Sequence, residues 1–176
     1  QSDKMTHLRT SLIPGLIEAL NYNINNNRKD IQLFEMGNVH IEEGKVRGEY
    51  MVVSGILYGL TCPESIHEQG KVKSHSIFTV KGHMEALMST IVQRNIKIEP
   101  GNDSLFTLGF SISHKKTLLG KFGKISDSFI KDELNSDLQD AYGFELMTDP
   151  LLKSLKEGTL YIPITKFPII ERELNI

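Results

Sequence analysis

The residues that could bind a metal ion are few and widely spaced. The six histidines lie at positions 7, 40, 67, 75, 83 and 114, and no two of them stand four residues apart on a predicted helix. Cys62, His67 and His75 are the set that one loop could offer to zinc. A tight zinc site needs more well-spaced ligands than these three. We therefore expect a solvated loop there, with incidental histidines.

Nucleophilic and phosphate-binding motifs are also missing from the sequence. Cys62 is the single cysteine, so an internal disulfide is excluded. It would attack a substrate only as a thiolate, which a nearby base or a helix N-terminus favours. The next residue is Pro63, and no helix is predicted to begin there. The chain contains no G-x-x-x-x-G-K-[ST], G-x-G-x-x-G, H-E-x-x-H or G-x-S-x-G. We expect no catalytic, cofactor-binding or metal-binding residue in this chain.

Two polar clusters keep alternative functions open. Carboxylates at Asp127, Asp132, Glu133, Asp137 and Asp140 could hold magnesium, but Lys131 lies among them and favours a solvated helix face. The run of asparagines from 21 to 27, followed by Arg28 and Lys29 and by Lys71 and Lys73, could contact RNA. Without a wider basic field we expect the asparagines to end a helix, because they tolerate left-handed geometry.

Composition limits the class of protein. The chain has 176 residues, 39% of them hydrophobic and 24% charged, which predicts a folded domain rather than a disordered tail. Twenty basic residues against 22 acidic ones disfavour a stand-alone generic nucleic-acid binder. No apolar run reaches the roughly 20 residues of a membrane span, so we expect no membrane partner. One thiol and no secretory leader are typical of a cytoplasmic protein.

The elements that would position these residues are read from hydrophobic periodicity and turn signals. Helices are predicted at 12–25, 79–94, 126–134 and from Asp149 to Gly158, with Met84 and Met88 in the core. Strands are predicted at 31–41, 50–60, 105–112, 117–125, 141–147 and 161–164. Residues 61–77 are predicted as a surface loop, and residues 95–104, which contain Pro100-Gly101-Asn102-Asp103, as a connector. Strands that arrive as hairpins predict an α+β fold with an antiparallel sheet flanked by helices.

Several segments, in order along the chain, resemble the bacterial phenylalanyl-tRNA synthetase β subunit. Met5 to Leu20 resembles its "LRTSLLPGLLEAL" helix, and Asn25 to Val39 resembles its Asn-rich turn and "LFEIG-V" strand. The other similar segments are Phe78–Leu87, Leu119–Ile125, Ala141–Leu146 ("AYAFELDLD") and Ile164–Leu174 ("ISKFP-x-x-x-RDL"). The set covers nearly the whole chain. Glu171 and Glu173 depart from the family pattern.

This resemblance implies a class II aminoacyl-tRNA synthetase core-like module that is catalytically silent. ATP, magnesium and phenylalanine would be handled by the α subunit, with which the β chain assembles into an α2β2 tetramer that acts on tRNA(Phe). The strand at Phe34-Glu35-Met36-Gly37 looks like part of the second class II motif, whereas the third motif, G-x-G-x-x-R, is absent. Arg9 and Arg172 fall on family arginines, for which we expect structural hydrogen bonds.

The resemblance also implies a domain division. Residues 1–160 would be the core-like module, and 161–176 a linker and the start of a truncated anticodon-binding domain. The polar start at Gln1 and the strand-like end at Ile176 predict a piece of a longer chain. Two other functions stay open. One is a cryptic nucleotide-binding enzyme, with Glu35 and the acidic stretch 127–140 holding magnesium. The other is a tRNA-contacting module that uses the Asn cluster and its neighbouring basic residues.

Overall fold

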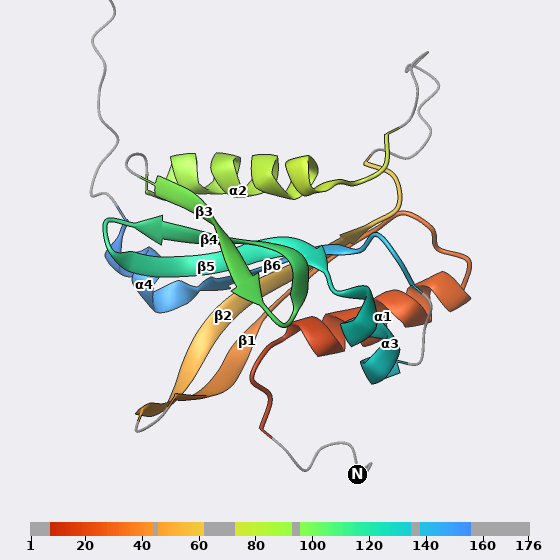
Figure 1. Cartoon of the computed structure of the whole chain (residues 1–176), viewed down its shortest axis with the longest axis horizontal. Coiled ribbons are helices and arrows are strands. Elements are labelled where there is room, and N and C mark those ends of the chain that lie inside the picture. The colour runs from red at the N-terminus through yellow and green to blue at the C-terminus, as the bar shows by residue number, and fades with distance from the viewer. Residues whose placement is uncertain (1–7, 44–45, 62–72, 93–95, 135–137, 156–176) are drawn as a thin grey trace, which may run out of the picture.

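A computed structural model describes residues 8–43, 46–61, 73–92, 96–134 and 138–155. They form a six-stranded antiparallel sheet with the strand order β1-β2-β6-β5-β4-β3. Helices lie on both of its faces, with α2 on one side and α1 and α3 on the other (Figure 1). The strands are β1 (Ile31–Glu43), β2 (Val46–Tyr58), β3 (Ile96–Asp103), β4 (Phe106–His114), β5 (Thr117–Ile125) and β6 (Tyr142–Met147). The helices are α1 (Ile13–Asn25), α2 (Ile77–Ile91), α3 (Asp127–Leu134) and α4 (Thr148–Lys153).

Helix α1 forms where its apolar residues recur at helical spacing. Ile13, Leu16, Ile17 and Leu20 are buried against the sheet. The helix ends in the asparagine cluster: Asn27 takes a positive φ of 61°, and the Arg28 N–H returns to the Asn23 carbonyl at 3.0 Å. A left-handed residue after the last turn is a common helix stop, and Asn tolerates it. The predicted termination is confirmed.

The β1–β2 hairpin is the longest pairing in the sheet. Its register runs from Ile31 opposite Tyr58 to Glu43 opposite Val46. The predicted hairpin is confirmed, but β2 begins four residues before the predicted Tyr50. Polar residues in this part of a strand do not prevent pairing, because backbone hydrogen bonds form the ladder whatever the side chain.

The connector predicted at 95–104 is wrong, because residues 96–103 form the edge strand β3. Ile98 pairs with Ile112 of β4, and Ile96 and Ile98 pack against the cluster under α2. Pro100 is tolerated because an edge strand can leave one side of its backbone unpaired. The register shifts between Gly101 and Asp103, where turn-forming residues produce an irregularity and not a loop.

The two faces of the sheet bury separate cores. On one face α1 and α3 cover residues that include Ile31, Ile56 and Ile125. On the other face α2 and α4 cover Leu57, Phe122 and other residues. Met84 and Met88 are fully buried there, as predicted. Helix α2 begins two residues before the predicted start, at a capping box that Ser76 and Thr79 form.

The remaining predicted helices are confirmed in position. Helix α3 begins at Asp127, and α4 begins at Thr148, with Asp149 and Pro150 in its first turn. The predicted helix end at Gly158, the predicted strand at 161–164 and the predicted domain boundary at 160 lie outside the described residues. In the described ranges no helix is long and apolar enough to cross a membrane.

Candidate functional site

A buried carboxylate joins the start of α1 to the middle of the sheet. Glu145 of β6 is 7% exposed. Its Oε2 accepts hydrogen bonds from Ser11 Oγ at 2.8 Å, Ser54 Oγ at 2.9 Å and the Leu12 N–H at 3.2 Å. Ser54 and Glu145 are register partners on β2 and β6. We call Ser11, Leu12, Ser54 and Glu145 the Glu145 junction.

The Glu145 junction is built to hold the backbone and not to transfer a proton. Its three donors all reach one oxygen of the carboxylate, which satisfies two hydroxyl groups and one N–H at a helix start. Ser11 also accepts the Ile13 N–H at 3.1 Å. The neighbouring cation Lys121 is engaged elsewhere, with Asp103 at 2.7 Å. The geometry therefore fixes the segment that enters α1 against the sheet.

Arg9 makes the structural bonds that the sequence predicts for it. Its Nε donates to the Asn38 carbonyl at 2.8 Å, and its Nη1 donates to Glu35 Oε1 at 2.9 Å. The His40 N–H donates back to the Arg9 carbonyl at 2.8 Å. Arg9 thus occupies Glu35, the residue that the cryptic-enzyme hypothesis assigns to magnesium. Arg172 lies outside the described residues.

The structure does not bring Glu35 together with the acidic stretch. Asp127 and Asp140 both approach Lys124 of β5, at 3.5 Å and 2.9 Å. Strands β1 and β5 are three strand spacings apart, which is about 14 Å. The hydrogen bond from Lys124 to Asp140 raises the pKa of Lys124, with Asp127 contributing. Asp132 is exposed, and Asp137 and the side chain of Glu133 lie outside what is described.

Of Cys62, His67 and His75, only His75 can be placed, since Cys62 and His67 lie outside the described residues. It is 5% exposed, so the prediction of a solvated histidine is wrong for His75. Its Nε2 lies 3.3 Å from Gln32 Nε2, while its buried Nδ1 meets no partner within the described ranges. Burial lowers the pKa of His75, and the nearby His83 lowers it further. Among the described residues no three His, Cys, Asp or Glu side chains are grouped to hold a metal.

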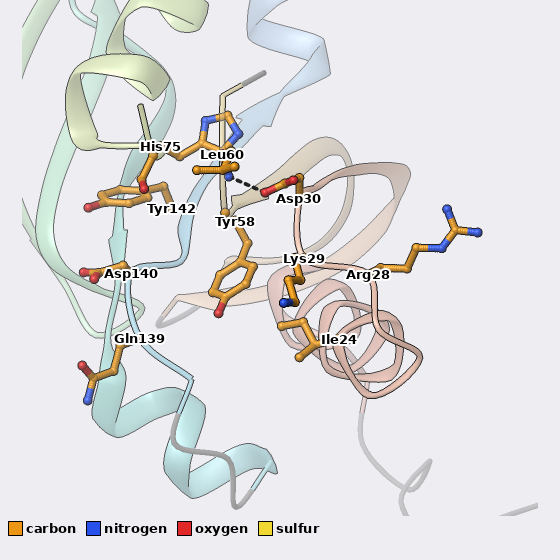
Figure 2. Close-up of a pocket in the computed structure, with 12 residues that line it drawn as sticks. Ile24, Arg28, Lys29, Asp30, Tyr58, Leu60, His75, Gln139, Asp140 and Tyr142 are labelled. Atoms are coloured by element: carbon orange, nitrogen blue, oxygen red, sulfur yellow. Dashed lines mark hydrogen bonds between the residues drawn. The ribbon is translucent and has the colours of Figure 1, made fainter. Parts of the chain in front are cut away.

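A pocket of about 920 Å³ opens at the end of the sheet where α1 stops and β1 starts. Ile24, Tyr58, Leu60 and Tyr142 supply apolar and aromatic surface, and Lys29 lies beside them. Figure 2 shows the Tyr58 ring and the Lys29 side chain pointing into the same space between α1 and β6. The pocket brings together parts of the chain that the sequence places far apart, and no sequence pattern predicts a pocket there.

Gly59 shapes this pocket. It follows β2 with a φ of 81°, and a Cβ there would collide with the Lys29 carbonyl oxygen. Its own carbonyl accepts the His75 N–H at 2.8 Å. A residue other than glycine would strain this geometry and push the two walls apart.

Residues 1–148 match the family model described as "Phenylalanyl tRNA synthetase beta chain CLM domain". The chain belongs to this family. It is 32% identical to the phenylalanine–tRNA ligase beta subunit of Staphylococcus aureus (strain MSSA476) and 29% identical to that of Listeria monocytogenes serotype 4b (strain F2365). Each match covers 99% of the chain and 22% of the relative, so the chain spans about a fifth of their length.

The fold is shared with a solved synthetase structure. The structure resembles a pyrrolysyl-tRNA synthetase from Desulfitobacterium hafniense, with a TM-score of 0.56 and 12% identity over 82% of this chain and 48% of that one. This likeness concerns the fold alone. It confirms the predicted class II core-like architecture, with an antiparallel sheet flanked by helices.

Three of the segments that carry the family resemblance meet in space in this CLM domain. Arg9 and Ser11 come from the first segment, Glu35 from the second and Glu145 from the fifth. Sequence reasoning missed the role of Glu145. The available signal was a carboxylate inside the apolar run Phe144-Glu145-Leu146, where a buried charge needs donors.

The CLM domain also leaves one apolar surface uncovered. On the side of the β1–β2 hairpin that faces away from α1, Phe34 is 79% exposed, Met36 62% and Met51 45%. Helices α2 and α4 pack over the strands further along the sheet, and Leu152 of α4 is exposed as well. We call Phe34, Met36 and Met51 the outer hairpin patch. Apolar side chains gathered this way are typical of an interaction surface.

Proposed function

We propose that this chain is a non-catalytic structural module of a phenylalanyl-tRNA synthetase β chain. The module supports α2β2 assembly for the ATP-dependent ligation of phenylalanine to tRNA(Phe) in the cytoplasm. The family match over residues 1–148 carries this proposal. The contacts of Glu35 with Arg9 and of Glu145 with Ser11 and Ser54 support it, because both carboxylates are engaged in positioning backbone.

The reacting groups lie on the α subunit in this proposal. ATP and magnesium bind there, and no residue of this chain takes part in adenylate formation. Residues 161–176 form a linker and the start of an anticodon-binding domain. The cryptic nucleotide-binding alternative requires Glu35 and the acidic stretch to hold magnesium together. Glu35 on β1 is separated from Asp127 and Asp140, which pair with Lys124 of β5, and this separation argues against the alternative.

The outer hairpin patch is the surface we propose for the α subunit. Exposed Phe and Met side chains are enriched in protein interfaces, and a charge placed among them opposes docking because it must be desolvated. Gln32 and Asn38 border the patch on the same strand, which gives it a polar rim.

Co-expression of the full β chain with its α subunit tests this function. Phe34→Asp with Met36→Asp is expected to abolish tetramer formation in light scattering. Leu108→Asp with Leu118→Asp, which changes two exposed leucines on β4 and β5, is the matched control and should leave the tetramer intact. Normal assembly of the Phe34/Met36 variant would refute the assigned surface.

A second experiment tests catalytic silence. Arg9→Ala with Arg172→Ala should leave adenylate formation, followed by ATP–pyrophosphate exchange, unchanged in an assembled tetramer. Complete loss of exchange with assembly intact would refute the structural role of these arginines.

A further inference from the structure

We propose that the pocket at the end of the sheet binds one unpaired nucleotide of an RNA strand. The base would lie against Tyr58, Ile24 and Leu60, and the backbone phosphates would contact Lys29 and Arg28. This inference rests on the proposed function, since it names a contact by which the module would touch RNA. The pocket is the starting observation, because its volume of about 920 Å³ is well above that of a single nucleotide and within the range of ligand sites.

Free positive charge makes an anionic ligand the best fit. No ion pair joins Arg28 or Lys29 to another residue of the described ranges. Of the acidic neighbours, Asp140 lies 2.9 Å from Lys124 Nζ, whereas Asp30 Oδ1 accepts the Leu60 N–H at 2.7 Å and keeps its charge. Arg28 and Lys29 therefore face one carboxylate that has no cationic partner among the described residues, and an excess of positive charge is left. The dashed contact between Asp30 and Leu60 is visible in Figure 2.

The apolar lining selects a planar group over a bare phosphate. Tyr58 and Tyr142 are half-buried, so part of each ring is held by the protein and part lines the pocket. A base stacked on an aromatic ring contributes binding energy whatever its identity, because every base has a π-face. In Figure 2 the Tyr58 ring enters the pocket beside Lys29, whereas the Arg28 guanidinium points away from the other labelled side chains. Lys29 can therefore meet the phosphate of the bound nucleotide, and Arg28 that of the next one.

A strand of RNA fits this layout better than a free nucleotide. Two cations that point in different directions match consecutive phosphates of one strand. Lys73 is exposed and lies at the same end of the sheet, where its carbonyl accepts the Thr61 N–H. With a net charge of −2 for the whole chain, binding must come from such a local arrangement and not from a general positive field.

Binding of a fluorescein-labelled RNA hexamer of adenosines, followed by anisotropy at several salt concentrations, tests the inference. Two phosphate contacts predict a slope of log K against log salt of about −1.4 for a single strand. In the full chain, Arg28→Gln with Lys29→Gln should bring this slope near zero and weaken binding about tenfold at low salt. Lys116→Gln with Lys131→Gln removes two exposed charges elsewhere and should change neither quantity.

The aromatic contact has its own pair of variants. Tyr58→Leu should weaken hexamer binding about tenfold, and Tyr58→Phe, which keeps the ring, should bind as the parent does. Equal loss in the Arg28/Lys29 variant and the Lys116/Lys131 control would overturn the site. Binding of AMP as tight as that of the hexamer would assign the pocket to a free nucleotide and overturn the RNA proposal. Tetramer assembly of the Arg28/Lys29 variant with α is read separately, so failure of this site is distinguishable from failure of the module's proposed function.

Discussion

The two faces of the β1–β2 hairpin come from alternate residues of the same strands, yet they differ sharply. On the face toward α1, Glu35 is held by Arg9, and Ser54 by Glu145. On the opposite face Phe34 and Met36 stand largely in solvent. The inner face is complete within the chain, whereas the outer hairpin patch is left for another surface to cover. The hairpin's stability should therefore depend more on the inner-face contacts, and assembly on the outer hairpin patch.

The largest expected effect is the loss of Glu145. Glu145→Ala leaves two hydroxyls and the Leu12 N–H without their acceptor in a buried site, and each unmet group costs about 1–3 kcal/mol. We expect urea unfolding to show a loss of at least about 3 kcal/mol. Glu49→Ala is the outer-face control, because Glu49 is exposed and, among the described residues, accepts a hydrogen bond from the Asn38 side chain alone. Equal losses for the two variants would erase the contrast between the faces.

The second-largest expected effect is a loss of unfolding free energy at acidic pH, which arises at the end of the outer face. Gln32 belongs to that face and meets His75, whose pKa is lowered below its ordinary 6.5 by burial and by His83, with Asp30 opposing. A lowered histidine pKa means that the unfolded chain binds more protons, so stability is full above about pH 6.5 and falls as the pH drops toward the folded pKa. Unfolding free energies measured from pH 7.5 to 5 should decline, and His75→Asn should flatten the decline. If the unfolding free energy of the His75→Asn variant declines with falling pH as steeply as that of the parent, His75 is not the cause of the decline.

Arg9 should matter less than Glu145 although both hold the same segment. Its side chain is about half exposed, with 49% of its surface accessible, and exposed ion pairs contribute little because water and salt screen them. Arg9→Ala should cost about 0.5 kcal/mol, less at high salt. Glu35→Ala is the partner control, and a double variant no worse than either single one would show that the two side chains act together.

The outer hairpin patch should give the smallest change in stability. Phe34→Thr with Met36→Thr keeps strand-forming residues and removes exposed apolar surface, so the free energy of unfolding should shift by no more than about 0.5 kcal/mol. The same variant should lose α-subunit binding in co-purification. A large loss of stability would show that the patch is already covered within this chain.

The sequence predicted the elements whose period is strong and missed those that tertiary contacts decide. Helix α1 and the β1–β2 hairpin follow from the spacing of Leu16 and Leu20 and from the polar turn after Ile41. Strand β3 was predicted as a connector because Pro100-Gly101 is typical of a turn, and only pairing with β4 makes it a strand.

The candidate sites divide in the same way. The structural role of Arg9 was expected from the family resemblance, whereas no local pattern reveals that Glu145 meets a serine on another strand and one before α1. The pocket at the sheet end draws on four separate segments, from Ile24 to Tyr142. Such a convergence depends on the strand order, which hydrophobic periodicity and turn signals do not assign.

The Glu145 junction has a consequence for the order of events on the ribosome. Arg9 and Glu35 are 26 residues apart, but Ser11 and Glu145 are separated by 134. Synthesis adds about 5–20 residues per second. Glu35 is therefore made roughly 1–5 s after Arg9, whereas Glu145 is made only roughly 7–27 s after Ser11. The segment before α1 can thus be tethered to the first hairpin while its hydroxyl and N–H still bind water. Its final anchor waits for the last strand of the sheet to be synthesised.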